Sequence, residues 1–136
     1  MLLVMKHEGS DVRLAKILVV DDEPAHRLLL RRIFERAGHE VSDASDGAAA
    51  LRAVAASRPD LVVTDMMMPV MDGPELIGRL RSEPATAGIP ILAASGDVHL
   101  AEGADAVVAK PYAWRHLAEV ADGLLKVKGV NRGEAD

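Results

Sequence analysis

Five side chains that can bind a metal or a phosphate stand where short apolar runs of the sequence end. Asp21 and Asp22 follow the first run, Asp65 follows a second, Ser95 a third and Lys110 a fourth. The runs have the β-branched, wholly apolar character of strands that are buried on both faces of a parallel sheet. Ligands of such sheets bind outside the carboxyl ends of the strands. Three carboxylates, a hydroxyl and an ammonium group are therefore expected at one rim.

This set of groups suits phosphoryl chemistry with a hard metal ion. Three neighbouring carboxylates repel one another, and at least one stays protonated unless a cation lies between them. Oxygen ligands with room for water suit Mg²⁺ better than a calcium cage, and zinc is disfavoured because none of the five histidines stands at these strand ends. A lysine beside such a site can neutralise a tetrahedral oxyanion. A carboxylate can itself attack phosphorus once a metal screens the two anions.

Each of these groups also has an ordinary structural explanation. The sequence Asp-Asp-Glu-Pro after a strand is typical of a helix N-terminus, Asp65 and Ser95 suit turns, and Lys110 followed by proline suits a solvated loop. Their joint occurrence at the ends of four different strands favours a common site.

Strands and helices alternate along the chain, which predicts a parallel sheet with helices on both faces. The strands are predicted at residues 17–20, 40–44, 60–64, 89–94 and 106–109, and the helices at 24–37, 47–56, 74–81 and 113–127. Helical spacing predicts two apolar faces that cover the sheet. They are His26, Leu29, Leu30, Ile33, Phe34 and Ala37 in the first helix, and Ala113, Leu117, Val120, Ala121 and Leu124 in the last.

Length and composition exclude several classes of protein. The 136 residues suit one domain, expected at residues 15–128, after an N-terminal extension (1–14) and before a flexible tail (129–136). A net charge of −5 disfavours nucleic acid or an anionic membrane as partner. The chain has no cysteine, so disulfides and thiolate metal sites are excluded. No apolar run reaches the roughly 20 residues that span a bilayer. A cytoplasmic location is therefore expected.

Three segments resemble the receiver domain of bacterial response regulators, which belongs to two-component signalling. They are residues 16–24 (Lys-Ile-Leu-Val-Val-Asp-Asp-Glu-Pro), residues 65–73 (Asp-Met-Met-Met-Pro-Val-Met-Asp-Gly) and residues 103–112 (Gly-Ala-Asp-Ala-Val-Val-Ala-Lys-Pro-Tyr). The second segment matches the family pattern Asp-x-x-Met-Pro-x-Met-Asp-Gly throughout. The resemblance covers about residues 15–127. It implies an α/β, flavodoxin-like, doubly wound sheet of five parallel strands in the order 2-1-3-4-5.

The resemblance also implies a metal site and a phosphoacceptor. Asp65 would accept the phosphoryl group and contribute to the Mg²⁺ site. Asp22 would bind Mg²⁺ directly, and Asp21 would do so directly or through water. Met67 lies two residues after the acceptor, and its backbone carbonyl would supply a further ligand.

Two further residues would contact the phosphoryl group in a domain of this kind. The Ser95 hydroxyl would follow it, and the Lys110 ammonium group would pair with one of its oxygens. Pro111 resembles the family's cis-proline, although the isomer is not encoded in the sequence.

The chain departs from the family pattern between Ser95 and Lys110. Only 15 positions separate these residues, about two helical turns of roughly 3.6 residues fewer than the family usually has. The family's fourth helix should therefore be a stub at about residues 98–102, or missing. Val107 stands where the family usually has the Tyr or Phe that serves as a rotamer switch. With this side chain too small for that role, residues 96–103 are expected to be the mobile element.

These features predict a stand-alone phosphoacceptor domain rather than an enzyme. A histidine kinase or a phosphotransfer protein would phosphorylate Asp65 in a phosphorelay, and a downstream protein would respond. Only one helix and a short tail follow Tyr112, so no DNA-binding output domain is expected, and the domain should be a monomer or a weak dimer. One alternative is a degenerate receiver that binds partners without phosphorylation. A second is a phosphatase with an Asp nucleophile, which would need an acid where Met67 stands.

Overall fold

The computed structural model describes residues 14–127 and alternates strands with helices along its whole length. The predicted N-terminal extension and tail lie almost wholly outside the described residues. The elements are β1 (Lys16–Val20), α1 (Pro24–Arg36), β2 (Glu40–Ala44), α2 (Gly47–Ala56), β3 (Leu61–Asp65), α3 (Gly73–Ser82), β4 (Ile91–Ser95), the 3₁₀ helix η2 (Val98–Ala101), β5 (Ala106–Ala109) and α4 (Trp114–Val127). Within residues 14–127, no helix is long and apolar enough to cross a membrane.

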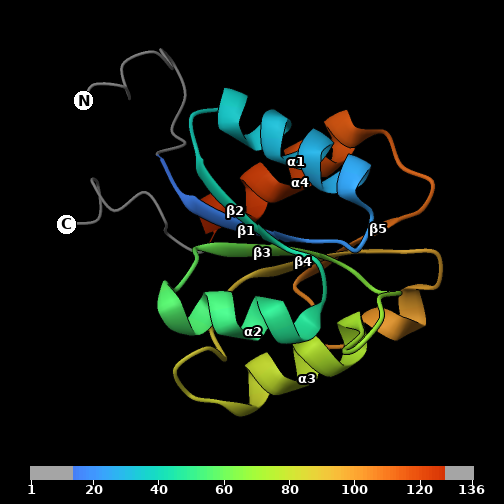
Figure 1. The fold of residues 1–136 in the computed structure, drawn as a ribbon. Coiled ribbons are helices and arrows are strands. Elements are labelled where there is room, and N and C mark those ends of the chain that lie inside the picture. The colour runs from blue at the N-terminus through green and yellow to red at the C-terminus, as the bar shows by residue number, and fades with distance from the viewer. Residues whose placement is uncertain (1–13, 128–136) are drawn as a thin grey trace.

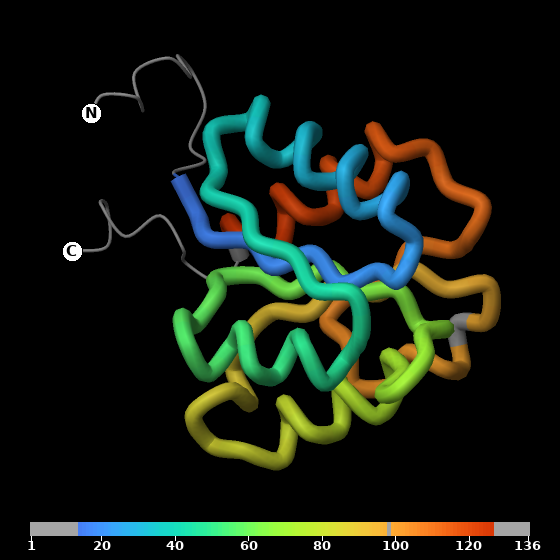
Figure 2. The backbone as a smooth tube through the Cα atoms, viewed as in Figure 1, coloured from blue at the N-terminus to red at the C-terminus, as the bar shows by residue number. Residues whose placement is uncertain are grey.

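The five strands form one parallel sheet in the order β2-β1-β3-β4-β5. Helices α1 and α4 cover one face of this sheet, and α2 and α3 cover the other (Figure 1). The predicted flavodoxin-like fold is therefore confirmed. Because every strand runs in the same direction, all five carboxyl ends lie at one edge, on the right in Figure 2.

Alternate residues of each strand supply the two layers of the core, as the two-residue period of a strand requires. Val19 of β1 packs in the layer under α1 and α4, with Phe34 and Leu117. Leu18 packs in the layer under α2 and α3, with Leu76. Burial on both faces explains why these strands are apolar without interruption.

The predicted apolar faces of the first and last helices need correction at their edges. Leu30 and Phe34 are buried, but His26, Leu29 and Ala37 are exposed. His26 and Leu29 line an open groove that Trp114 borders on its other side. Ala113 is also exposed, since it precedes α4. In α4 the fully buried residues are spaced by four, at Leu117, Ala121 and Leu125, and the predicted Val120 and Leu124 are partly buried against the same core.

The connection from β4 to β5 is short, as predicted, and contains only the four-residue helix η2. Arg81 at the end of α3 fastens the far end of this connection. Its guanidinium donates to the Gly103 carbonyl at 2.9 Å and to Asp105 Oδ2 at 2.8 Å. Ala101 is buried as well. The prediction of mobility therefore applies best to residues 96–100, which precede these attachments.

The loop between β3 and α3 contains a strained residue. Val70 has a φ of 67°, and the Met71 N–H donates to the Pro69 carbonyl at 2.7 Å, which makes a γ-turn centred on Val70. A β-branched residue rarely adopts positive φ, because its side chain crowds the backbone. The Val70 side chain is 82% exposed, so packing does not compensate for the strain.

We expect Val70→Asn to raise the free energy of unfolding by about 1 kcal/mol, because asparagine tolerates positive φ and valine does not. The measurement is chemical denaturation of the purified domain. Val70→Ile is the matched control, since isoleucine keeps the branch at Cβ and should give no gain. A gain of equal size in both variants would mean that backbone strain is not the cause.

Candidate functional site

Strand register brings the predicted acids together at the rim. Val20 of β1 is paired with Thr64 of β3, so the next residues, Asp21 and Asp65, leave the sheet side by side. With Asp22 they form a cluster in which one oxygen from each carboxylate lies within 4.8 Å of the others. Asp21 and Asp65 are only 4% and 7% exposed, whereas Asp22 is open to solvent.

Lys110 supplies the positive charge of this cluster. It follows β5 directly, and its Nζ lies 2.5 Å from Asp65 Oδ1. Burial alone would lower the pKa of Lys110, but the hydrogen bond and charge of Asp65, together with the charge of Asp21, raise it overall. The Lys110–Pro111 peptide bond is cis, the isomer that the resemblance implied.

Asp21 is held at the rim by neighbours from the start of α1. The Glu23 N–H donates to its Oδ1 at 3.0 Å, and His26 Nδ1 lies 3.4 Å from its Oδ2. Burial raises the pKa of Asp21, and the Asp65 charge raises it further. The Glu23 hydrogen bond and the charges of His26 and Lys110 only partly offset this increase. Ionisation of Asp21 is therefore less favourable in the folded protein than in water.

The backbone beyond Asp65 turns sharply because of the Asp-Gly pair that ends the motif. Asp72 caps α3 by accepting a hydrogen bond from the Glu75 N–H at 3.0 Å. A Cβ on Gly73 would lie 2.6 Å from Met66 Cα and 2.7 Å from the Asp65 carbonyl oxygen. Only glycine allows α3 to start this close to Asp65. The motif therefore holds the backbone next to Asp65 in place.

Ser95 lies at the same rim, but its hydroxyl is engaged away from Asp65. Ser95 is 2% exposed, and its Oγ donates to the Asp97 carbonyl at 2.6 Å and accepts from the Asp97 N–H at 3.0 Å. The Asp97 carboxylate caps η2 through the His99 N–H at 2.9 Å. The contact of Ser95 with a phosphoryl group, implied by the resemblance, stays a prediction that requires the hydroxyl to turn.

Two further positions that the sequence analysis discussed, 67 and 107, both lie at the surface. Met67 is 71% exposed and follows the acceptor by two residues, and the role of its carbonyl as a metal ligand stays a prediction. Val107, in place of the usual aromatic switch, is 37% exposed on β5. The short β4–β5 connection leaves it without the cover of a full helix.

The donor set suits the predicted Mg²⁺. All three groups are carboxylates, and the open side at Asp22 leaves room for water. Asp21, Asp22 and Asp65 would hold the ion.

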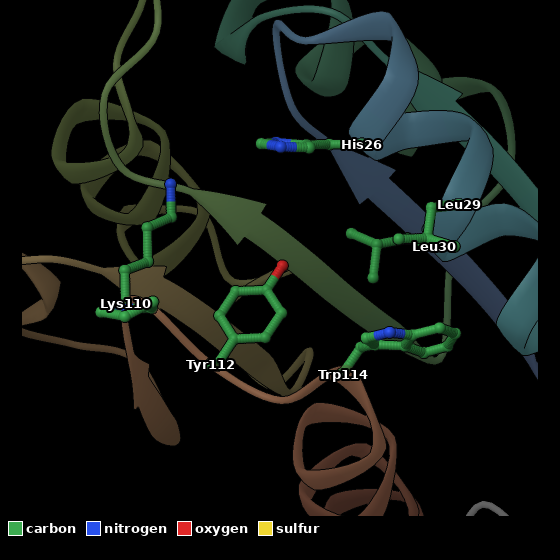
Figure 3. Close-up of a pocket in the computed structure, with 7 residues that line it drawn as sticks. His26, Leu29, Leu30, Lys110, Tyr112 and Trp114 are labelled. Carbon is green, nitrogen blue, oxygen red and sulfur yellow. The ribbon is translucent and has the colours of Figure 1, made fainter.

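Sequence reasoning missed two polar side chains close to this site. His26 reaches Asp21 from the first turn of α1, and Tyr112 follows the cis-proline with its hydroxyl pointing into the groove beside Lys110 (Figure 3). They line a groove of about 460 Å³ with apolar side chains that include Leu29 and Trp114. His26 could have been predicted from its position in the first helix turn after Asp21 and Asp22. Tyr112 is the last residue of the third segment that resembles the receiver domain, and that segment gives it no role of its own.

Comparison with known proteins identifies relatives along most of the chain. The response regulator receiver domain family matches residues 17–122. The alkaline phosphatase synthesis transcriptional regulatory protein PhoP of Bacillus subtilis is 39% identical over 107 residues, which are 75% of this chain and 45% of PhoP. Response regulator MprA of Mycobacterium sp. (strain KMS) is 40% identical over 123 residues, which are 87% of this chain and 54% of MprA. The chain thus spans about half the length of these curated relatives.

Solved structures have the same fold. The chemotaxis response regulator CheY4 of Vibrio cholerae superposes with a TM-score of 0.76 at 29% identity, covering 83% of this chain and all of CheY4 (100%). Response regulator TrrA of Thermotoga maritima, in complex with Mg(2+)-BeF, gives a TM-score of 0.74 at 32% identity and covers 82% of this chain and 100% of its own.

We expect Asp21→Asn to raise the thermal midpoint of the metal-free domain at neutral pH. The folded-state pKa of Asp21 lies above the ordinary value of 3.8, so its ionisation costs stability. That cost is absent below the ordinary pKa and grows as the pH rises through the folded-state pKa. The gain in Asp21→Asn should therefore shrink toward acid pH. Added Mg²⁺ should raise the midpoint of the wild-type domain more than that of the variant.

Thermal unfolding between acid and neutral pH, with and without Mg²⁺, checks this prediction. Asp122→Asn on α4 is the matched control, because it removes a carboxylate outside the cluster and should show neither effect. An Asp21→Asn variant that is less stable than wild type at neutral pH would contradict it.

Proposed function

The chain belongs to the response regulator receiver domain family, and on this basis we propose that Asp65 accepts a phosphoryl group from a phosphohistidine donor and that protein contact passes the signal on. One observation carries the proposal. A nearly buried carboxylate, Asp65, lies within 4.8 Å of two further acids and is hydrogen-bonded to Lys110 at the open end of the sheet.

The reaction is a single displacement at phosphorus. One carboxylate oxygen of Asp65 forms a bond to phosphorus, the P–N bond to the donor imidazole breaks, and its electron pair stays on the ring nitrogen. Lys110 already neutralises one oxygen of Asp65 and is placed to pair with a phosphoryl oxygen once that bond has formed. Bound Mg²⁺ would screen the two anions as they approach. Asp21 and Asp22 supply its other carboxylate ligands.

The donor is proposed to be a histidine kinase or a phosphotransfer protein. The surface next to the acceptor suits a protein partner, because Leu29 and Trp114 are 41% and 42% exposed at the groove between α1 and the start of α4. Arg27 and Arg31 lie on another side of α1, where their guanidinium groups are bonded to the Asp21 carbonyl and to Asp43. The exposed apolar patch fits a helix that carries apolar side chains.

Two alternative functions have less support. An Asp-nucleophile phosphatase needs an acid two residues after the nucleophile, and Met67 occupies that place. We propose accordingly that the domain is not an enzyme beyond its own phosphorylation. A degenerate receiver is favoured by the exposed Val107 and the turned Ser95, but it gives no reason for an intact cluster of Asp21, Asp22, Asp65 and Lys110.

The role of the protein beyond this domain stays a proposal, because the chain covers only part of its curated relatives. PhoP is described as a transcriptional regulatory protein, and the chain covers only 45% of it. The expectations of a stand-alone domain and of no nucleic-acid partner therefore stay predictions.

A phosphodonor experiment tests the proposal directly. Wild-type domain incubated with a small-molecule phosphodonor and Mg²⁺ should gain one phosphoryl group by mass spectrometry. Asp65→Asn, or wild type in excess chelator, should gain almost none, because three clustered anions cannot receive another one unscreened. Asp72→Asn is the matched control, since it changes an acid of the same motif outside the cluster. Equal labelling in chelator would refute the assignment of the acids.

Loss of the phosphoryl group should be slow, and Met67→Asn should speed it by roughly threefold to tenfold. A thioether is a weak hydrogen-bond acceptor, whereas an amide can hold the attacking water at the acyl phosphate. The decay of phosphorylated protein after removal of donor measures the rate. Met67→Leu is the control for loss of the sulfur alone. An unchanged rate in Met67→Asn would exclude control at this position.

A further inference from the structure

The methionines around the acceptor differ widely in exposure. Met66 is 1% exposed, and Met68 and Met71 pack against the core beneath α2 and α3. Met67 is 71% exposed, the most open methionine among residues 14–127. Among the methionines that the structure describes, Met67 is therefore the most open to an oxidant in solution, and it stands two residues from Asp65.

The loop that carries Met67 is fixed on both sides, so this exposure follows from the fold. The Gly73 N–H donates to the Met66 carbonyl at 2.9 Å, and the Gly47 N–H donates to the Met71 carbonyl at 2.9 Å. The buried Met66 side chain anchors the loop next to Met67. The backbone on both sides of Met67 is thus held in place, and the Met67 side chain is exposed on it.

We propose that Met67 is a site of oxidation by peroxides, and that its sulfoxide shortens the lifetime of the phosphoryl group on Asp65. In this step a sulfur lone pair attacks one peroxide oxygen, an S–O bond forms and the O–O bond breaks. The sulfur is oxidised and hydrogen peroxide is reduced to water. The effect on lifetime rests on the proposed phosphoacceptor function, whereas the oxidation does not.

The consequence for hydrolysis follows from the change in hydrogen bonding. A thioether hardly binds water, but a sulfoxide oxygen is a strong acceptor and can hold a water molecule beside the acyl phosphate. Two polar groups that follow β4 are hydrogen-bonded within the chain. Asp97 Oδ1 accepts from the His99 N–H, and the Ser95 hydroxyl is bonded to the Asp97 backbone. The sulfoxide would add a strong acceptor at position 67, where the thioether provides only a weak one.

The first test measures oxidation alone. The full chain is treated with dilute hydrogen peroxide, digested and analysed by mass spectrometry over time. Among the methionines at positions 66, 67, 68 and 71, we expect Met67 to gain oxygen several times faster than the others. Faster oxidation of Met66, Met68 or Met71 would overturn the proposal before any activity is measured.

The second test measures the lifetime of the phosphoryl group. Each protein is compared with itself, before and after peroxide treatment, so that the ratio of the two decay rates does not depend on its untreated rate. We expect a ratio of roughly threefold to tenfold for wild type, the effect of one added hydrogen bond on a rate. In Met67→Leu, which keeps the other methionines, the ratio should be about one.

The outcomes separate this inference from the proposed function. If untreated wild type takes up no phosphoryl group, the proposed function fails and the effect on lifetime fails with it. If wild type is labelled and Met67 is oxidised, but both decay rates are equal, only the inference is overturned. A ratio in Met67→Leu equal to that of wild type would also overturn it, because the effect would then come from another residue.

Discussion

The repulsion among three carboxylates at one end of the sheet is the constraint around which the rest of the structure is arranged. Asp21, Asp22 and Asp65 lie within 4.8 Å of one another, and Lys110 is the cation hydrogen-bonded to this cluster. Burial of Asp21 and Asp65 strengthens their interaction, since the low local dielectric screens charge poorly. The pKa of Asp21 is raised, first by its burial and further by the charge of Asp65. Binding of a divalent cation, and of the phosphoryl group proposed for Asp65, would change the charge balance of this cluster.

The backbone around the carboxylate cluster holds Asp21 and Asp65 side by side and includes a locally strained residue. Register between β1 and β3 sets Asp21 beside Asp65, and the absence of a side chain on Gly73 lets α3 begin against the acceptor's own carbonyl. Val70 keeps an unfavourable positive φ in the same loop. Local strain of this kind persists where the surrounding structure fixes the chain, and it is common at functional sites.

Most of the fold could be predicted from the sequence because it depends on local patterns. Uninterrupted apolar runs predicted the strands. The polar residues that end these runs predicted which groups lie at the carboxyl edge of the sheet. The differences arose where a side chain depends on contacts that the spacing does not give. His26 falls on the predicted apolar face of α1 but is exposed at a groove whose other residues, such as Trp114, are distant in sequence. The Ser95 hydroxyl is bonded to the Asp97 backbone in a local turn that apolar periodicity does not encode.

The shortened β4–β5 connection shows how a missing helix changes the possible routes from site to surface. Arg81 ties the end of α3 to Gly103 and Asp105, so the second half of the connection is attached to the element that begins directly behind Asp65. The first half begins at Ser95, whose hydroxyl is bonded to Asp97 and must leave it to reach a phosphoryl group. The connection thus meets the acceptor at both ends, through Ser95 and through α3. With Val107 in place of the usual aromatic residue, these two attachments would be the route by which a change of charge at Asp65 reaches this surface.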